Sequence, residues 1–125
     1  MVAPSFSIEC DPAGPFLHLS LVGDWNRVIA DRFATEVAGG IRGMIAAGAL
    51  PGTFLTLIDM SRKNILPQDI ATDMARMLRP DSPSRRIAFV VSGSLHLLQA
   101  RRLCESEGRR CFPTEEAARQ WLFAD

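Results

Sequence analysis

The chain has 125 residues, of which 47% are hydrophobic and 22% charged, and this composition is typical of a globular protein and excludes a disordered one. Fourteen basic and fourteen acidic residues cancel, although residues 1–60 carry three basic and six acidic residues and residues 61–125 carry eleven and eight. This asymmetry is too small to indicate nucleic-acid binding. The length predicts a single domain spanning residues 1–125.

Cysteine content and the N-terminal sequence indicate the compartment. The three cysteines (Cys10, Cys104 and Cys111) form no C-x-x-C pair, so neither a disulfide framework nor a zinc site is expected. The N-terminus lacks the basic and apolar regions of a signal peptide, and no apolar run approaches the roughly 18 residues of a membrane span. We therefore expect a cytoplasmic protein that does not span a membrane and holds no metal or cofactor.

The first elements are a hairpin and a long helix. Phe6–Cys10 and Phe16–Val22 are predicted strands, and the short Pro- and Gly-containing turn between them can join only antiparallel neighbours. Asp24 or Asn26 is the candidate N-cap of a helix that runs to about Ala47. Its apolar residues recur at steps of three and four and predict one buried face: Phe33, Val37, Ile41 and Met44.

The centre of the chain predicts a strand, a loop and a helix. Phe54–Ile58 has the length and composition of a buried strand, and a polar loop, Ser61-Arg62-Lys63-Asn64, is expected after Asp59. Pro67 suits the first position of a helix that ends at Leu78, because the missing N–H of proline is not needed there. The same βα pattern then repeats. The remaining predicted elements are a strand over Ile87–Val91, a helix over about Leu95–Glu107, a strand over Arg110–Phe112 and a final helix capped by Thr114.

The resulting order, β-β-α-β-α-β-α-β-α, predicts an α/β fold with a mostly parallel sheet and an N-terminal antiparallel hairpin. Four features carry a resemblance to a known family: the hairpin, Gly23-Asp24-Trp25 before the long helix, Leu57–Ser61 closing the next strand, and Trp121-Leu122 in an alanine-rich last helix. Together they resemble the STAS superfamily (sulfate transporter and anti-sigma antagonist domains), and more closely its stand-alone bacterial SpoIIAA-like or STAS/SEC14-type proteins.

The resemblance implies a regulatory, protein-binding role. Anti-sigma antagonists of this superfamily carry a phosphorylated serine in an Asp-Ser-Ser-Gly turn before the second helix. Here the corresponding positions are Leu66-Pro67-Gln68-Asp69, which offer no hydroxyl group. The resemblance therefore implies a module without the usual phosphorylation switch, with Ser61 as a possible substitute site.

Our leading hypothesis is an interaction module, not an enzyme, that binds a protein partner at the carboxyl ends of the strands. Polar residues gather after these strands, and ligands and partners meet α/β sheets at such edges. Asp59 would orient the loop, Arg62 and Lys63 would supply charge, and Trp25 would be an apolar anchor. The full predicted set is Asp24, Trp25, Asp59, Ser61, Arg62, Lys63, Asn64 and Ser92.

Two other functions stay open. The methionine-rich helix Ile70–Leu78, with Met44 and Met60, is compatible with a carrier of a lipid or small apolar ligand, since methionine lines adaptable pockets. A hydrolase using Asp59, Ser61 and His96 is a remote alternative, because no G-x-S-x-G motif accompanies these residues. Apolar residues without an evident core position, such as Leu95 and Leu98, would also suit a homodimer contact.

Overall fold

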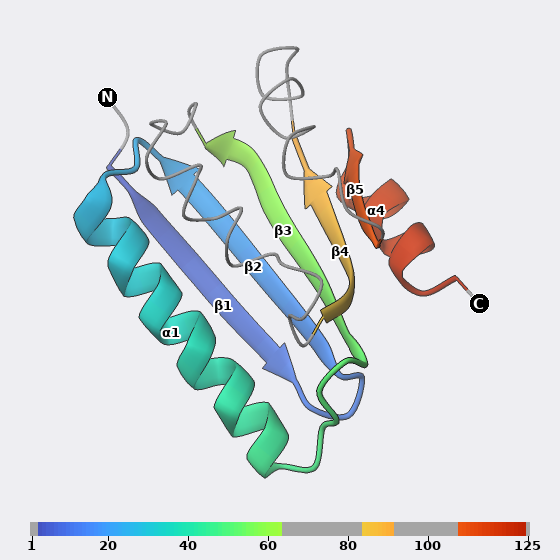
Figure 1. The fold of residues 1–125 in the computed structure, drawn as a ribbon. Helices are drawn as coiled ribbons and strands as arrows, with labels where there is room; N and C mark the ends of the chain where they lie inside the picture. The colour runs from blue at the N-terminus through green and yellow to red at the C-terminus, as the bar shows by residue number, and fades with distance from the viewer. Residues whose placement is uncertain (1–2, 64–83, 92–107, 125) are drawn as a thin grey trace.

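The computed structural model of the protein describes residues 3–63, 84–91 and 108–124, except for the side chains of residues 62, 63 and 84. These residues form five strands and two helices (Figure 1). In chain order they are β1 (Ser5–Asp11), β2 (Phe16–Gly23), α1 (Arg27–Ala46), β3 (Phe54–Lys63), β4 (Ser84–Val90), β5 (Arg109–Phe112) and α4 (Glu115–Leu122). The helices predicted over 67–78 and 95–107 lie outside the described residues and stay predictions.

The strands form one sheet in the order β1-β2-β3-β4-β5. β1 is antiparallel to β2, and β2, β3, β4 and β5 are mutually parallel. Parallel neighbours need a crossover connection, which α1 provides between β2 and β3. The prediction of an α/β fold with a mostly parallel sheet and an opening antiparallel hairpin is therefore confirmed.

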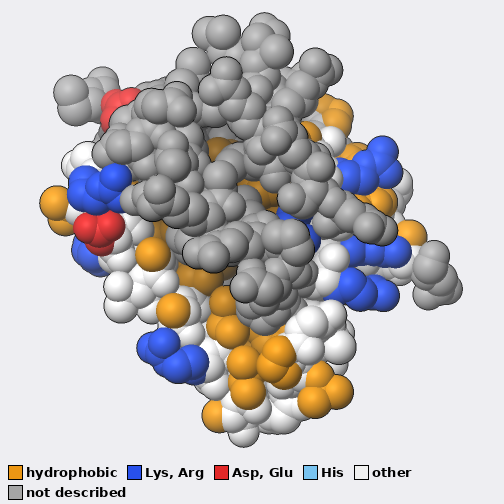
Figure 2. Space-filling view, viewed as in Figure 1, with side chains coloured by type: hydrophobic (Ala, Val, Ile, Leu, Met, Phe, Trp, Pro, Cys, Tyr) orange, Lys and Arg blue, Asp and Glu red, His pale blue; other side chains and the backbone are white. Residues whose placement is uncertain are grey.

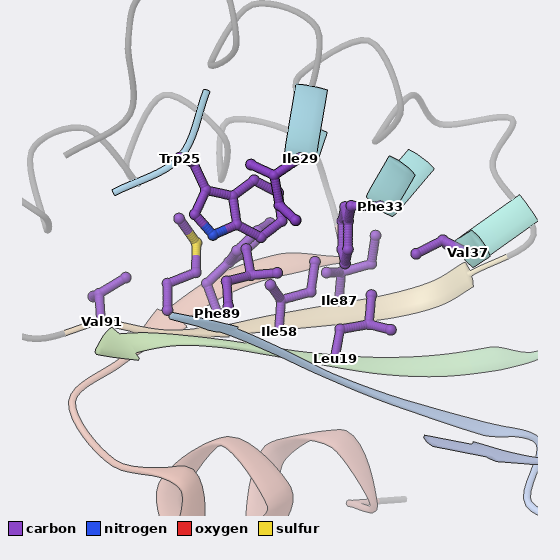
Figure 3. Close-up of a cluster of buried hydrophobic side chains, with 11 residues drawn as sticks. Leu19, Trp25, Ile29, Phe33, Val37, Ile58, Ile87, Phe89 and Val91 are labelled. Carbon is purple, nitrogen blue, oxygen red and sulfur yellow. The ribbon is translucent and has the colours of Figure 1, made fainter. Parts of the chain in front are cut away.

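α1 covers one face of the sheet. Asn26, and not Asp24, is its N-cap, since the Asn26 side-chain oxygen accepts a hydrogen bond from the Ile29 N–H at 3.1 Å. From this start, Ile29, Phe33 and Val37 point toward the sheet (Figure 3). They pack on alternate residues of the strands. Packing of its apolar face is the main source of stability for an amphipathic helix. The strand residues labelled in the same cluster are Leu19, Ile58, Ile87 and Phe89.

α4 lies on the opposite face of the sheet (Figure 3). Thr114 caps it as predicted, accepting a hydrogen bond from the Ala117 N–H at 3.2 Å. At its other end, Arg86 Nη1 donates to the carbonyl oxygens of Trp121 at 2.8 Å and Ala124 at 2.9 Å. Carbonyls at a helix C-terminus have no partner within the helix, so Arg86 ties this end of α4 to β4. The apolar side of α4 packs against the sheet in a second core cluster. This cluster includes Leu55, Leu57, Ala88, Val90, Ala118 and Leu122.

The prediction that the third strand gives way to a polar loop at Asp59 is wrong. β3 continues through Lys63, so Ser61, Arg62 and Lys63 are strand residues. Polar residues at the end of a strand lower its predicted strand propensity, but pairing with β2 on one side overrides this preference.

One glycine is required where β5 begins. Gly108 has φ +80°, and a Cβ at this position would lie 2.6 Å from the carbonyl oxygen of Arg85. The Gly108 carbonyl in turn accepts a hydrogen bond from the Ile87 N–H at 2.8 Å. Glycine therefore lets β5 approach β4 closely enough to pair.

Two glycines of α1 face different surroundings. A Cβ on Gly40 would lie 3.0 Å from Cys10 Sγ of β1, whereas a Cβ on Gly43 would meet no atom within 4 Å. The contact with α1 also partly buries the Cys10 thiol, and this burial raises its pKa. Gly40 thus allows close approach of α1 to β1, and Gly43 has no such role.

We expect Gly43→Ala to raise the free energy of unfolding by about 0.5–1 kcal/mol, because alanine favours the helix and nothing obstructs its methyl group. Gly40→Ala should give a smaller gain or a loss, because its methyl group would displace the Cys10 thiol. Urea unfolding of both variants measures the difference. Equal gains would show that the contact between α1 and β1 does not depend on glycine.

Candidate functional site

The parallel register brings the predicted charged residues to one edge of the sheet. Val22 of β2 pairs with Arg62 of β3, and Gly23 pairs with Lys63. Asp24 follows directly in the chain, so the ends of β2 and β3 and the start of α1 share the carboxyl edge (Figure 1). Asn64 and Ser92, which were predicted to join them, lie outside the described residues.

A β-bulge in β3 precedes this edge. Ser20 pairs with Asp59 but Val22 pairs with Arg62, so β3 has one residue more than β2 over this interval. Met60 and Ser61 together oppose Leu21, and Met60 is buried in the core on the α1 side. A bulge adds local twist and breaks the ladder at one residue. Met60 of β3 therefore stays buried, and the residues of β3 after the bulge pair with β2 in a register shifted by one residue.

Asp59 supplies the bonds that the bulge needs. One carboxylate oxygen, Oδ1, accepts hydrogen bonds from the Ser61 N–H at 2.9 Å and from the Ser61 Oγ–H at 2.6 Å. Asp59 was predicted to orient a loop after the strand, but the amide that it binds belongs to β3 itself. Hydrogen bonds to a carboxylate are stronger than those between neutral groups, which makes this contact a fixed point of the edge.

Trp25 is not the exposed anchor that the sequence suggested. Its side chain is 5% exposed and belongs to the α1-side core (Figure 3). The ring packs edge-on against Phe33 with centroids 5.2 Å apart, and its Nε1–H donates to the Val22 carbonyl at 3.1 Å. A tryptophan between a strand and a helix can fold back over the sheet, and here the bond to Val22 fixes it there. This prediction is therefore corrected.

The exposed apolar residue at this edge is Val28, which the sequence analysis missed. Val28 lies in the first turn of α1 and is 70% exposed. The helical spacing contained the signal, since Ile29, Phe33 and Val37 define the buried face and Val28 falls outside it. Val28 adjoins Arg27, which forms an ion pair with Asp31 at 3.8 Å.

A second polar cluster lies on the α4 face of the sheet. His18 of β2 has Nδ1 3.7 Å from Glu9 Oε2 and Nε2 3.3 Å from Glu115 Oε1. Nε2 is buried and satisfies no hydrogen-bond geometry within the part of the chain that the structure describes. Glu115 is distant from His18 along the chain, so local sequence patterns do not indicate this contact. No set of three or more His, Cys, Asp or Glu residues in the described ranges is arranged to hold a metal ion.

Comparisons with known proteins identify the architecture. No protein-family model matches the chain, and no curated protein matches it significantly. An uncharacterized protein of the DUF3478 family from Shewanella loihica PV-4, with a SpoIIAA-like fold, matches with a TM-score of 0.71. The match covers 98% of this chain and 97% of that one at 17% sequence identity. The chain has a SpoIIAA-like fold.

This SpoIIAA-like fold confirms the resemblance at the level of architecture. At 17% identity the likeness carries no residue roles from one protein to the other. Within the described ranges, no helix combines the length and the apolar content needed to cross a bilayer.

Asp59→Ala is expected to lower the free energy of unfolding by about 1–2 kcal/mol, because it removes two charge-assisted hydrogen bonds from the bulge. Ser20→Ala is the matched control: Ser20 pairs with Asp59 across the sheet, and its removal should change stability by less than about 0.5 kcal/mol. Chemical denaturation of the two variants measures both values. If the two variants are equally stable, the bulge does not depend on Asp59.

Proposed function

We propose that this protein is a small regulatory module that binds a protein partner through the carboxyl edge of its sheet and is not an enzyme. The observation that carries the proposal is Val28, an apolar side chain that is 70% exposed in the first turn of α1. When a partner covers a solvent-exposed valine, the burial of its apolar surface stabilises the complex. Its position beside the strand ends places it within a surface of mixed charge.

The segments that meet at this edge contain charged residues that suit specific recognition. Asp24, Arg27 and Asp31 come from the segment that leads into α1 and from its first turns, and Arg62 and Lys63 come from the end of β3. Residues of both signs around an apolar contact set the orientation of a partner and discourage wrong partners. The Asp59 bulge gives this surface a rigid base, so little conformational entropy is lost on binding. The cytoplasm is the proposed compartment, where the thiols of Cys10 and Cys111 would stay reduced.

The two alternatives have less support. Met44 and Met60 are buried in two different core clusters, and the other methionines of the carrier hypothesis lie outside the described residues. For the hydrolase, Ser61 Oγ bonds to Asp59, but His96 lies outside the described residues. Self-association into a homodimer also stays a prediction, which light scattering of the purified protein would test.

Val28→Glu should reduce recovery of the partner about tenfold or more, since a charge would replace an apolar contact at the centre of the proposed surface. The measurement is affinity capture of the tagged protein from a lysate of its own host, quantified by mass spectrometry. Leu50→Glu is the matched control, because Leu50 is 67% exposed but lies between α1 and β3, at the other edge of the sheet.

A second variant removes charge without touching the bulge. Arg62→Ala combined with Lys63→Ala should weaken binding of the same partner. Salt in the wash should release the partner from the wild type more than from this variant, which lacks the two charges. Asp59 is left unchanged in this test because of its structural bonds. A partner retained by both the Val28 and the Arg62/Lys63 variants would exclude the carboxyl edge as the binding surface.

A further inference from the structure

Two arginines contact one tryptophan where α4 packs on β4 and β5. The guanidinium carbons of Arg86 and Arg110 lie 5.5 and 5.9 Å from the centroid of the Trp121 ring. Arg110 also lies 5.8 Å from the centroid of Phe112, whose ring is 5.6 Å from that of Trp121. The two rings and two guanidinium groups thus form one contiguous group from β4, β5 and α4.

The two arginines have different roles in this group. Arg86 is half-buried and uses Nη1 to bind the carbonyl oxygens of Trp121 and Ala124, so it holds the end of α4. Arg110 is exposed, and its guanidinium makes ring contacts but no hydrogen bond or ion pair with the described part of the chain. Both rings lie within cation–π distance of this guanidinium, which restricts its position.

The surrounding charge is unbalanced. Residues 84–91 and 108–124 contain five arginines and two glutamates. One of these glutamates, Glu115, is paired with Arg119 at 3.1 Å. Basic side chains gather along the side of the molecule where β5 and α4 lie, with no described acidic side chain visible among them in that view (Figure 2). Over these two described ranges the arginines outnumber the glutamates, which favours an acidic ligand.

A guanidinium stacked on aromatic rings is well suited to bind a carboxylate. Stacking holds its plane and leaves the N–H groups at its edge directed outward, where they match the two oxygens of a carboxylate. Less side-chain entropy is lost on binding than for a free arginine, because the rings already restrict its rotamers. Arg86 adds a second positive charge close by. Its Nη1 already binds two backbone carbonyl oxygens, so Arg110 is the arginine that would bind the carboxylate.

We propose that Arg110, supported by Trp121, Phe112 and Arg86, forms a docking site for an acidic peptide segment of a protein partner. The excess of positive charge selects glutamate- or aspartate-rich chains, and the half-buried rings of Phe112 and Trp121 offer contact for an apolar residue within such a segment. This site lies on β5 and α4, whereas the carboxyl-edge surface is formed by the ends of β2 and β3 and the start of α1. The inference does not depend on the function proposed for that edge.

The test is titration of the full chain with a capped eight-residue peptide of six glutamates and two leucines, followed by nuclear magnetic resonance of the tryptophan indole N–H groups. The chain has two tryptophans, and Trp25 is buried in the core, so it reports fold integrity. We expect a saturable shift of the Trp121 signal alone, which weakens as salt is added. Arg110→Gln should weaken binding by about three- to tenfold.

Arg119→Gln is the matched control, because Arg119 also stacks on a ring, that of Phe16 at 5.2 Å, but is paired with Glu115. This variant should change the peptide affinity by less than about twofold. The absence of a saturable shift at millimolar peptide, or equal affinities of the wild type and Arg110→Gln, would overturn the site. Inorganic phosphate that binds as tightly as the peptide would overturn the assignment to a peptide.

Discussion

The contact between Asp59 and Ser61 is the constraint on which the carboxyl edge depends. An extra residue in a strand leaves a backbone N–H without a partner in the ladder, and a buried or half-buried donor without a partner costs stability. At this bulge Asp59 Oδ1 accepts hydrogen bonds from the N–H and the hydroxyl of Ser61. With the bulge held in this way, Met60 enters the core while Arg62 and Lys63 pair with Val22 and Gly23. Core packing and the position of the charged strand end therefore follow from one carboxylate.

The two faces of the sheet are packed differently. On the α1 face, aromatic and aliphatic residues form a large core that includes Trp25 and Phe33. On the α4 face, the apolar cluster of β3 and β4 is bordered by polar and charged contacts, including His18 with Glu115 and Arg86 with the end of α4. Contacts at such a border hold the helix in place but leave side chains within reach of solvent. This explains why the arginines that stack on aromatic rings concentrate around α4.

Much of the fold could be predicted from local patterns, and the corrected parts depend on contacts across the sheet. Alternating leucines in β2 and the Asn26 and Thr114 caps are signals within a few residues, and the structure contains them. The continuation of β3 to Lys63 depends on pairing with β2, which no local propensity reports. The burial of Trp25 likewise depends on a helix and a sheet that meet only in three dimensions. Val28 was predictable from helical spacing, but Arg110 and Trp121 meet only because β5 and α4 fold together.

The two proposed surfaces lie on different parts of the same sheet. The carboxyl edge is built on the bulge of β3, whereas the Arg110 group is built on β4, β5 and α4. Both are attached to the same rigid sheet, so occupation of one leaves the geometry of the other unchanged unless α4 moves. Arg86 opposes such a movement, since it binds the end of α4 to β4 while touching Trp121. A partner that spans both surfaces would gain affinity through the higher effective concentration of its second contact, with no conformational change in this chain.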